Sequence, residues 1–357
     1  MDLDNILYNS HSRWMEASGP DSDVVLSSRV RLARNLEDVP FPPRMGSEGA
    51  TRVLHMIERA LPDLNKDPQL GPVGMVSLDS LSGLDRQVLV EKHLISPQHA
   101  EHPRGRAIIL REDEILCIMV NEEDHLRIQS LQPGMALDQA WQMAAAADDV
   151  LEGRLAYAFC QRRGYLTTCP TNVGTGLRGS VMVHLPALTM VGQARNVFSA
   201  LGKLGLAVRG LYGEGSEAHG NVFQISNQTS LGPAEEEILR SLKAVTSQVV
   251  GHERNARKAL LAQTRPQLED RVWRAYGLLT NARVMSSEEA IRLWSDVRLG
   301  VDLEIISGEV SLEQLNELLV ASRPGFIQKV VGRELDPGER DMERAALIRH
   351  RLRGGHR

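Results

Sequence analysis

Short apolar runs separated by charged or glycine-rich stretches dominate the first half of the chain. Residues 107–110 and 115–120 form two such runs, and the charged stretch 111–114 between them predicts an antiparallel hairpin. Residues 24–26 and 88–90 form further short apolar runs. Because short apolar runs bounded by polar residues are typical of strands, the first half is predicted to be rich in β-structure.

Helical and strand-like patterns are mixed in the middle of the chain. The sequence predicts helices over residues 137–159 and 189–204, strands over 181–185, 206–211 and 222–225, and glycine-rich loops over 171–179 and 213–220. Strict alternation of strand and helix would indicate a doubly wound parallel sheet, and it is absent here. The pattern therefore favours the α+β class, with an antiparallel sheet flanked by helices.

The pattern becomes helical after Pro233. Residues 234–262 form a long, charged helical pattern, and the capping boxes Ser286-x-x-Glu289 and Ser311-x-x-Gln314 each precede apolar residues at helical spacing. A basic helix is predicted over 339–353. We place a boundary near residue 254, which divides the chain into an N-terminal segment (1–23), an α+β body (24–254) and a C-terminal helical domain (255–357).

Composition and charge narrow the possible functions. Hydrophobic residues make up 42% of the 357 residues and charged residues 24%, which excludes a disordered or fibrous chain. The 41 Lys and Arg against 46 Asp and Glu give a formal charge of -5, so bulk charge does not favour direct nucleic-acid or membrane binding. Only six of the basic residues are lysines, and arginine is the side chain whose planar fork binds phosphate and carboxylate bidentately.

The cysteines and the N-terminus indicate a cytoplasmic protein. Cys117, Cys160 and Cys169 are odd in number and not closely paired, which fits a reducing compartment. Residues 1–4 are acidic, unlike the start of a secretory leader. The most membrane-like stretch, 178–195, is too short and too polar to span a bilayer.

The segment Ser27-Ser28-Arg29-Val30-Arg31 is the first candidate for chemistry. In a strand, Arg29 and Arg31 lie on the same face because successive side chains alternate. Two neighbouring guanidinium groups repel each other unless an anion lies between them. The segment therefore indicates either an anion site or a solvated basic edge.

The run Asn-Glu-Glu-Asp-His-Leu-Arg at residues 121–127 is the second candidate, directly after an apolar strand. Three adjacent acids at the end of a buried strand suit a metal site, a general base or a cation site. An ordinary charged strand end is the alternative interpretation.

The third candidate is the run from Cys169 to Arg178, whose Gly174-x-Gly176-x-x-Gly179 pattern formally matches a dinucleotide fingerprint. That match fails on context, because a strand-like run follows where a helix should begin. Cys169 itself is either a nucleophile or, more commonly for such a cysteine, a small buried residue.

The fourth candidate is Arg209-Gly210-Leu211-Tyr212-Gly213-Glu214, which puts one arginine and one carboxylate on a loop after a strand. The chain contains no Gly-x-x-x-x-Gly-Lys-Ser/Thr phosphate loop and no kinase-like lysine strand motif. His99-x-x-His102 has a possible metal spacing but no third ligand, so a solvated loop is the better interpretation.

Taken in order, the four segments resemble the phosphagen (guanidino) kinase family over about residues 20 to 254. The runs at 121–127 and 169–176 are long and specific to that family. The resemblance implies phosphoryl transfer from ATP, with Mg²⁺ carried by the nucleotide rather than by protein ligands, to a guanidino group.

The resemblance also implies the roles of particular residues. Glu123 and Glu214 are expected to be the catalytic carboxylates, with Cys169, Thr171 and Asn172 close to the acceptor. Leu110 stands where the family usually has an adenine-side histidine, which leaves His93 as the candidate for that contact. The residues expected around ATP are Ser27, Ser28, Arg29, Val30, Arg31, His93, Arg127, Arg178, Gly179, Ser180, Val181, Met182, Arg209, Gly210, Leu211, Tyr212, Gly213 and Glu214, and the five arginines among them are expected to bind its phosphates.

Two departures from most phosphagen kinases point to one branch of the family. The first arginine segment begins at residue 27, which leaves no counterpart to the small helical domain that precedes it in those kinases, and a helical extension follows the body. Both features resemble the bacterial members that phosphorylate arginine side chains of proteins. By that resemblance, Arg340, Asp341, Arg344 and Ala345 form an allosteric phosphoarginine-binding site; a charged helix with an Asp341–Arg344 ion pair is the alternative.

The resemblance implies partners as well. They are protein substrates with exposed arginines, an activator protein, a transcriptional repressor, a Clp chaperone-protease and a second copy of the chain in a homodimer or higher oligomer. Two other functions stay open: a kinase for free arginine or another small guanidine, and a non-catalytic adaptor that binds phosphoarginine.

Overall fold

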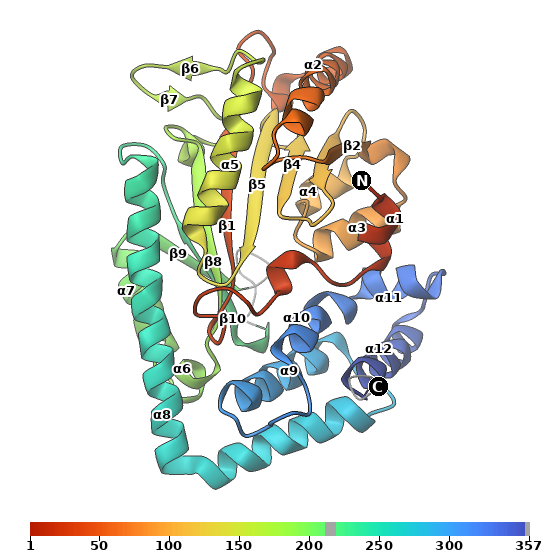
Figure 1. Ribbon diagram of the computed structural model, residues 1–357, viewed down its shortest axis with the longest axis vertical. Helices are drawn as coiled ribbons and strands as arrows, with labels where there is room; N and C mark the ends of the chain where they lie inside the picture. The colour runs from red at the N-terminus through yellow and green to blue at the C-terminus, as the bar shows by residue number, and fades with distance from the viewer. Residues whose placement is uncertain (211–218, 354–357) are drawn as a thin grey trace.

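A large antiparallel sheet forms the centre of the molecule (Figure 1). The computed structural model describes residues 1–210 and 219–353. The strands are β1 (Val25–Arg34), β2 (Val73–Ser77), β3 (Ala107–Arg111), β4 (Leu116–Val120), β5 (Leu126–Pro133), β6 (Phe159–Cys160), β7 (Gly164–Tyr165), β8 (Leu177–His184), β9 (Leu206–Gly210) and β10 (Val222–Asn227). Eight of them form one sheet in the order β2-β3-β4-β5-β1-β8-β10-β9 with antiparallel neighbours throughout, and β6 pairs with β7 in a separate hairpin.

Helices surround this sheet. The α-helices are α1 (Leu3–Tyr8), α2 (Ser47–Lys66), α3 (Gly83–Glu91), α4 (Pro97–Glu101), α5 (Leu137–Glu152), α6 (Pro186–Met190), α7 (Ala194–Lys203), α8 (Glu235–Asn281), α9 (Ser287–Asp302), α10 (Leu312–Ala321), α11 (Pro324–Val331) and α12 (Pro337–Arg353). Short 3₁₀ helices are η1 (Arg13–Met15), η2 (Pro42–Arg44), η3 (Leu78–Ser80), η4 (Pro170–Asn172) and η5 (His219–Asn221). No helix in the part of the chain that the structure describes has the length and apolar character needed to cross a bilayer.

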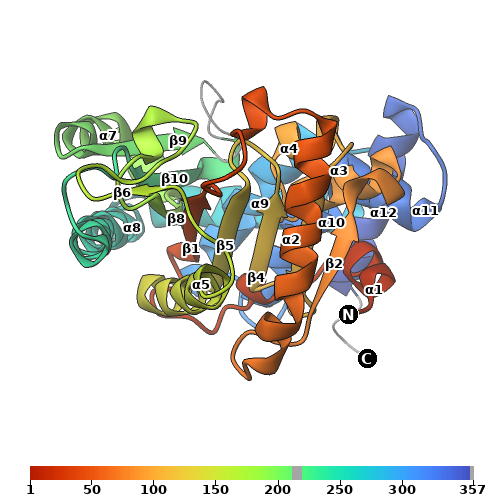
Figure 2. The ribbon, with the colours of Figure 1, turned by 90° about the horizontal axis from the view of Figure 1, so that it is seen from above.

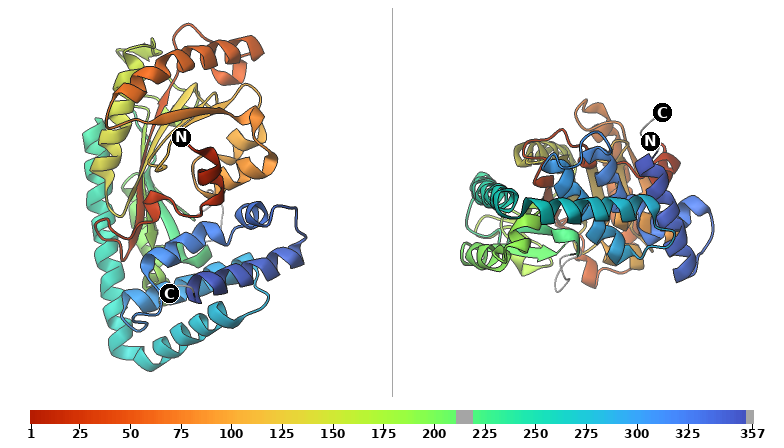
Figure 3. Two further views of the ribbon diagram at one scale, coloured as in Figure 1. Left: turned by 45° about the vertical axis from the view of Figure 1, so that its right-hand side comes forward. Right: turned by 90° about the horizontal axis from the view of Figure 1, so that it is seen from below.

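The two faces of the sheet bury different sets of side chains. One face packs against α2, α5 and the first half of α8, and its core includes Val30, Leu32 and Val181 (Figure 3). The other face packs partly against α1, α3 and the C-terminal helices α9 to α12 (Figure 2). The central strands leave part of that second face open between these helices, and the candidate site lies there.

The α+β antiparallel fold is confirmed, and so are several predicted elements. The apolar runs on either side of the charged stretch 111–114 pair as the antiparallel strands β3 and β4. Ser286 and Ser311 both cap helices, accepting from the amides of Glu289 and Gln314 at 3.1 Å each. The basic C-terminal helix is α12.

Three local predictions were wrong. Residues 88–90 lie in α3, whose capping box between Ser82 and Asp85 outweighs the short apolar run. The helix predicted over 137–159 ends at Glu152, next to Gly153, and the helix predicted over 189–204 is two helices, α6 and α7. The amphipathic helix α2 was not predicted at all.

The predicted boundary near residue 254 lies inside a continuous helix. α8 runs from Glu235 to Asn281, and its backbone departs from helical geometry at Thr264, two residues before Pro266. The helices after this bend share an apolar core with the sheet and with the N-terminal segment, which contributes Trp14 and Met15. The three predicted units therefore pack together rather than standing apart.

Candidate active site

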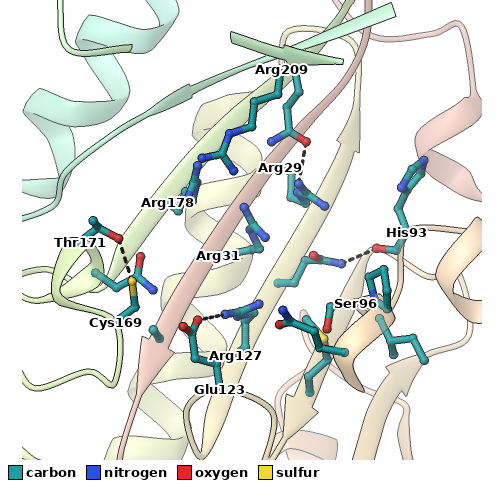
Figure 4. A pocket seen from close by; sticks show the side chains of 18 of the residues that line it. Arg29, Arg31, His93, Ser96, Glu123, Arg127, Cys169, Thr171, Arg178 and Arg209 are labelled. Carbon is teal, nitrogen blue, oxygen red and sulfur yellow. Dashed lines mark hydrogen bonds and ion pairs between the residues drawn. The ribbon is translucent and has the colours of Figure 1, made fainter. Parts of the chain in front are cut away.

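The strand register brings five arginines to one open face of the sheet (Figure 4). Arg29 and Arg31 lie two residues apart on β1, and Arg31 pairs directly with Arg178 of β8. On the other side of β1, Arg127 of β5 pairs with Ala33. Arg209 is on β9 at the edge of the sheet. Residues far apart in sequence thus become neighbours because β1 lies between β5 and β8.

These arginines line a cavity of about 850 Å³. The same cavity is lined by Glu123, Cys169, Thr171 and Asn172 on one side and by His93 and Ser96 on another (Figure 4). This volume lies within the range of about 300–1,000 Å³ that is common for small-ligand sites. The structure therefore brings the five arginines, Glu123 and the three residues expected near the acceptor into one cleft.

The crowded guanidinium groups make the cleft strongly electropositive. Burial lowers the pKa of Arg31 well below its ordinary value, and the positive charges of Arg29, Arg127 and Arg178 lower it further. Burial and the same kind of repulsion, from Arg178 and Arg127, lower the pKa of Arg29 to about 10. The Nε atom of Arg31 is buried without a hydrogen-bond partner. Guanidinium groups held this close together, one of them with an N–H that has no hydrogen-bond partner, are suited to binding a polyanion.

Polar neighbours orient Arg29. Its Nη2 donates to Oε1 of Gln224 at 2.8 Å, and its Nε donates to the Ser180 hydroxyl at 3.4 Å. Ser27, Ser180 and Met182 line a small recess beside Arg29 together with His93. These contacts fix the guanidinium plane toward the cavity.

The three adjacent acids at the end of β4 have three different roles. Glu122 is buried and binds Nη1 of Arg127 at 2.9 Å, while it also accepts from the Ser96 hydroxyl at 2.6 Å. Asp124 is buried and accepts from the Asn35 amide at 2.6 Å and from the Thr168 main-chain amide at 2.7 Å. Only Glu123 lines the cavity, and its side chain is 35% exposed.

Glu123 has the properties of a base that faces a cationic group. Its Oε2 lies 2.7 Å from Nη2 of Arg127. Burial raises the pKa of Glu123, and the neighbouring carboxylates of Asp124 and Glu122 also raise it, while Arg127 opposes the shift. A raised pKa makes the carboxylate a better proton acceptor than an ordinary surface glutamate.

Cys169 and η4 form the cavity wall next to Glu123. The Cys169 sulfur lies 3.1 Å from the Thr171 hydroxyl, and Thr171 and Asn172 also line the cavity. The amide of Thr168, just before Cys169, is bound by Asp124. The acidic run and the cysteine loop are therefore connected, and the loop's position depends on Asp124.

His93 lies at the far end of the cavity, in the turn after α3. Its backbone has a left-handed φ of 62°, and its carbonyl accepts from Gln129 at 2.9 Å. Burial and the Arg29 charge lower the pKa of His93 to about 3, so its imidazole is neutral at physiological pH. Val90, Ile95 and Met119 add apolar surface to this end.

Some residues expected around ATP do not face the cavity. The Ser28 hydroxyl bonds to the Gly134 carbonyl at 2.8 Å, and Val30 and Val181 are buried in the core on the opposite face. A side chain at Gly179 would contact Leu242 rather than the cavity. Alternation along β1 and β8 dictates these positions, so none of these four residues presents a side chain to the cavity.

The remaining expected residues divide into two groups. Gly210 lines the cavity. Leu211, Tyr212, Gly213 and Glu214 lie outside the described residues, so the predicted second carboxylate has no structural account.

The sequence prediction missed several cavity residues. Gln224 of β10 orients Arg29, and Ser96 positions Glu122. Alternation along β10 puts Gln224 on one face with Val222 and Ser226 and would not by itself single it out. Ser96 precedes Pro97 at the start of α4, a helix-start signal that indicates structure rather than function.

The four C-terminal residues expected to bind phosphoarginine lie on α12. Arg344 is buried, donating from Nε to the Ser322 carbonyl at 2.8 Å and from Nη1 to the Met285 carbonyl at 2.9 Å. Asp341 binds Arg344 at 2.5 Å, and Ala345 is buried. Arg340 is partly exposed and donates to the Leu335 carbonyl at 3.4 Å.

The arginine-lined face fits a nucleotide polyphosphate. The buried, unused Nε of Arg31 and the mutual repulsion of its neighbours both call for a bound anion. Across residues 1–210 and 219–353, no group of three or more His, Cys, Asp or Glu is arranged to hold a metal ion.

Comparison with known families identifies the class of enzyme. Residues 52–256 match the family ATP:guanido phosphotransferase, C-terminal catalytic domain. The crystal structure of lombricine kinase matches with a TM-score of 0.58 and 25% identity, covering 71% of this chain and 70% of that one. The duplicated taurocyamine kinase from Schistosoma mansoni also matches with a TM-score of 0.58, at 28% identity, covering 71% of this chain and 35% of that one. The chain belongs to the ATP:guanido phosphotransferase family, and it is an ATP-dependent phosphotransferase.

Full-length relatives narrow this assignment. Residues 265–356 match the protein-arginine kinase McsB C-terminal domain. The protein-arginine kinase of Symbiobacterium thermophilum is 54% identical over 352 residues, covering 99% of both chains. That of Bacillus subtilis is 49% identical over 352 residues, covering 99% of this chain and 96% of the relative. Within the family, the chain is a protein-arginine kinase.

Proposed function

We propose that the cleft transfers the γ-phosphoryl group of ATP to a terminal nitrogen of an arginine side chain, with donor and acceptor held by residues of opposite charge. The observation that carries this proposal is the position of Glu123 in the same cavity as the five arginines. Arg29, Arg31, Arg127, Arg178 and Arg209 bind the phosphates. Glu123 and Cys169 face the acceptor, and Glu214 is proposed as its second carboxylate.

The acceptor needs a base because a guanidinium is protonated near neutral pH and its nitrogen is then a poor nucleophile. In the proposed step the nitrogen attacks the γ-phosphorus, the bond to the β–γ bridging oxygen breaks, and ADP leaves with that electron pair. Glu123 accepts the proton that the nitrogen loses. Arg127, bound to both Glu122 and Glu123, places this base next to the phosphate site.

Mg²⁺ is proposed to enter the cleft bound to the ATP phosphates. Phosphoryl transfer depends mainly on positioning and on neutralising charge, and Mg²⁺ bound to the nucleotide would supply part of that neutralisation. The arginines bind the remaining phosphate oxygens. The base of ATP is proposed to lie toward His93, where Val90, Ile95 and Met119 offer apolar surface.

The cellular role is a further part of the proposal. Phosphorylated arginines are proposed to mark proteins for a Clp-type chaperone-protease, and a transcriptional repressor of stress genes is proposed as one substrate. An activator protein and a homodimer or higher oligomer complete the proposed partners, and the proposed location is the cytoplasm. The full-length likeness to bacterial protein-arginine kinases supports this proposal.

The catalytic proposal is tested by incubating the protein with ATP, Mg²⁺ and an unfolded acceptor protein. We expect acid-labile phosphate on arginine side chains, mapped by mass spectrometry under neutral handling. Supplying free arginine in place of the protein separates this function from a small-guanidine kinase. Phosphate found only on hydroxyl side chains, or only on free arginine, contradicts the proposal. Absence of any transfer by a folded, ATP-binding protein favours the adaptor alternative.

We also propose that α12 binds phosphoarginine, with Arg340 contacting the phosphate and Asp341 the residual guanidinium. Arg344 then holds Asp341 in place, since it binds that carboxylate at 2.5 Å while anchored to main-chain carbonyls. Replacing Arg340 with alanine is expected to weaken binding of free phosphoarginine by about 10- to 100-fold, the range for a lost hydrogen bond to a charged group. Isothermal titration calorimetry measures this.

Arg333→Ala is the matched control, since Arg333 pairs with Glu339 on the same surface and is exposed. Arg344→Ala is expected to abolish binding and also to lower the melting temperature, because it removes buried contacts. If wild type, Arg340→Ala and Arg344→Ala bind phosphoarginine with equal affinity, the proposed site on α12 is contradicted.

A further inference from the structure

The end of α3 and the start of α11 are joined by one partly buried carboxylate. Glu91 is the last residue of α3, and its two oxygens accept from the main-chain amides of Gly325 and Phe326 at 2.8 Å each. These amides belong to the first turn of α11, where the helix itself provides no acceptor. A negative charge at a helix N-terminus is favourable, so the contact holds the two helices together.

The fit at this contact depends on a glycine. A Cβ atom built on Gly325 would lie 2.9 Å from each Glu91 oxygen and 2.8 Å from Cγ of Gln87. Those distances are too short for any residue with a side chain unless both Glu91 and Gln87 move. Any side chain at position 325 is therefore expected to push the carboxylate away from α11.

The residues on either side of Glu91 form part of the wall of the nucleotide cavity. Val90, His93 and Ile95 line that cavity. The turn between them is tight, with the His93 amide bonded to the Val90 carbonyl at 2.9 Å. Lys92 is buried and donates to the Ile6 carbonyl at 2.9 Å, which fixes the turn from the other side. A shift of Glu91 would therefore move the cavity wall.

The first turn of α11, which Glu91 binds, is connected in turn to α12. Residues 322–326 comprise the short connection between α10 and α11 and the first turn of α11, and Arg344 of α12 donates to the Ser322 carbonyl at 2.8 Å. One end of this stretch is bound by α12 and the other by Glu91. The C-terminal helices are thus linked to the cavity wall by the side chains of Arg344 and Glu91 and by the backbone of residues 322–326.

We propose that Glu91 is a positioning residue through which the C-terminal helices set the shape of the ATP-binding wall at His93. This inference rests on the proposed location of the nucleotide base next to His93. Glu91 itself does not line the cavity, so its effect acts through the turn after α3. The role differs from that of Glu123, which faces the reacting groups.

The test is Glu91→Gln, which keeps the side-chain size and removes the charge. We expect the KM for ATP to rise about 5- to 50-fold, within the usual range of coupling between two parts of a protein. The kcat at saturating ATP and the KM for the acceptor protein are expected to change less than about threefold. Steady-state kinetics with both substrates varied give these values, and calorimetry with ADP gives nucleotide affinity directly.

Lys329→Met is the matched control. Lys329 of α11 pairs with Asp85 of α3 at 2.6 Å, in the same interface but at the first turn of α3 rather than at its last residue. Loss of this partly buried pair is expected to leave the KM for ATP within about twofold of wild type, because neither residue lines the cavity. If the interface between α3 and α11 had only a structural role, Glu91→Gln and Lys329→Met would change the KM for ATP to the same extent.

Two measurements decide the proposal even if Glu91→Gln folds poorly. Gly325→Ala displaces the same carboxylate from the other side and is expected to raise the KM for ATP in the same way. In wild type, saturating ADP is expected to slow hydrogen exchange of the Gly325 and Phe326 amides at least about fivefold, because coupling is reciprocal.

The outcomes separate this inference from the proposed function. A folded Glu91→Gln or Gly325→Ala variant with wild-type KM for ATP, or amide exchange unchanged by ADP, overturns the role of Glu91. Failure of wild type itself to bind ADP or phosphorylate arginine overturns the proposed function instead. A fall in kcat with an unchanged KM for ATP also overturns the inference.

Discussion

Glu123→Gln is expected to slow phosphoryl transfer to arginine by about 10²- to 10⁴-fold, the usual contribution of a general base, with little change in ATP affinity. Glutamine keeps the size of the side chain but cannot accept the proton that the guanidinium must lose. ATP affinity is preserved because Arg127 keeps its second carboxylate partner, Glu122, at 2.9 Å. Single-turnover kinetics and calorimetry with ADP measure the two quantities separately.

Glu122→Gln is the matched comparison, since it makes the same chemical change one residue away. Glu122 does not line the cavity, and it holds Arg127 and Ser96. Its loss is therefore expected to raise the KM for ATP more than it lowers kcat. Near-normal turnover by Glu123→Gln, or the same kinetic pattern in both variants, contradicts the assignment of Glu123 as the base.

The pH dependence of the wild type provides a second check on Glu123. Its pKa is raised above the ordinary value of 4.5, chiefly by burial, so the protonated, inactive form persists to a higher pH than for an exposed glutamate. The kcat/KM is expected to fall about tenfold per pH unit once the pH is below this raised pKa. The residual activity of Glu123→Gln should lack that acidic limb.

Local sequence patterns predicted those parts of the site in which the side-chain positions depend on a single strand. Alternation along β1 was enough to put Arg29 and Arg31 on one face. The same rule, applied to every residue of the segment, excludes Ser28 and Val30 from that face. The family resemblance assigned whole segments to ATP, and only the alternation within them separates cavity residues from core residues.

Long-range strand order could not be predicted from local patterns. Arg127 and Arg178 become neighbours of Arg31 because β1 lies between β5 and β8, although β8 is about 150 residues further along the chain than β1. The different directions of Glu122, Glu123 and Asp124 likewise depend on the turn that begins at Asn121, whose φ is 61°. Sequence spacing indicates that acids are present there, but not which one faces the cleft.

Charge crowding at the site implies a conflict between stability and function. A partly buried arginine among three others is unfavourable in the free protein and becomes favourable when a polyphosphate binds. Natural active sites often keep such locally destabilising groups because the bound state needs them. Arg31 is the residue where this conflict is most clearly defined.

Arg31→Met is expected to abolish most activity while raising the melting temperature of the free protein. The variant loses a phosphate contact, and removal of one preorganised donor typically costs about 10²- to 10³-fold in rate. It also removes a desolvated charge whose pKa is lowered by burial and by Arg29, Arg127 and Arg178, with only Glu122 acting in the opposite direction. Methionine fills a similar space without charge. Each kcal/mol gained would raise the melting temperature by about 1–2 °C in a chain of this size.

Arg34→Met provides a matched control on the same strand. Arg34 is buried more completely than Arg31, but its guanidinium is bound by the Asp148 carboxylate at 2.5–3.1 Å and stacks on the Tyr165 ring at 3.5 Å. Breaking a buried ion pair costs about 3–5 kcal/mol, so this variant is expected to melt at a lower temperature. The same substitution on one strand should therefore change stability in opposite directions.

Ligand-dependent melting completes the Arg31 test. Wild type is expected to gain thermal stability with ADP and Mg²⁺, since a ligand that binds only the folded state stabilises it by mass action. Arg31→Met should gain much less at the same concentrations, although it melts higher without ligand. A lower melting temperature for ligand-free Arg31→Met would contradict the view that repulsion dominates at this position. An undiminished shift with ADP would contradict the assignment of Arg31 to the phosphates.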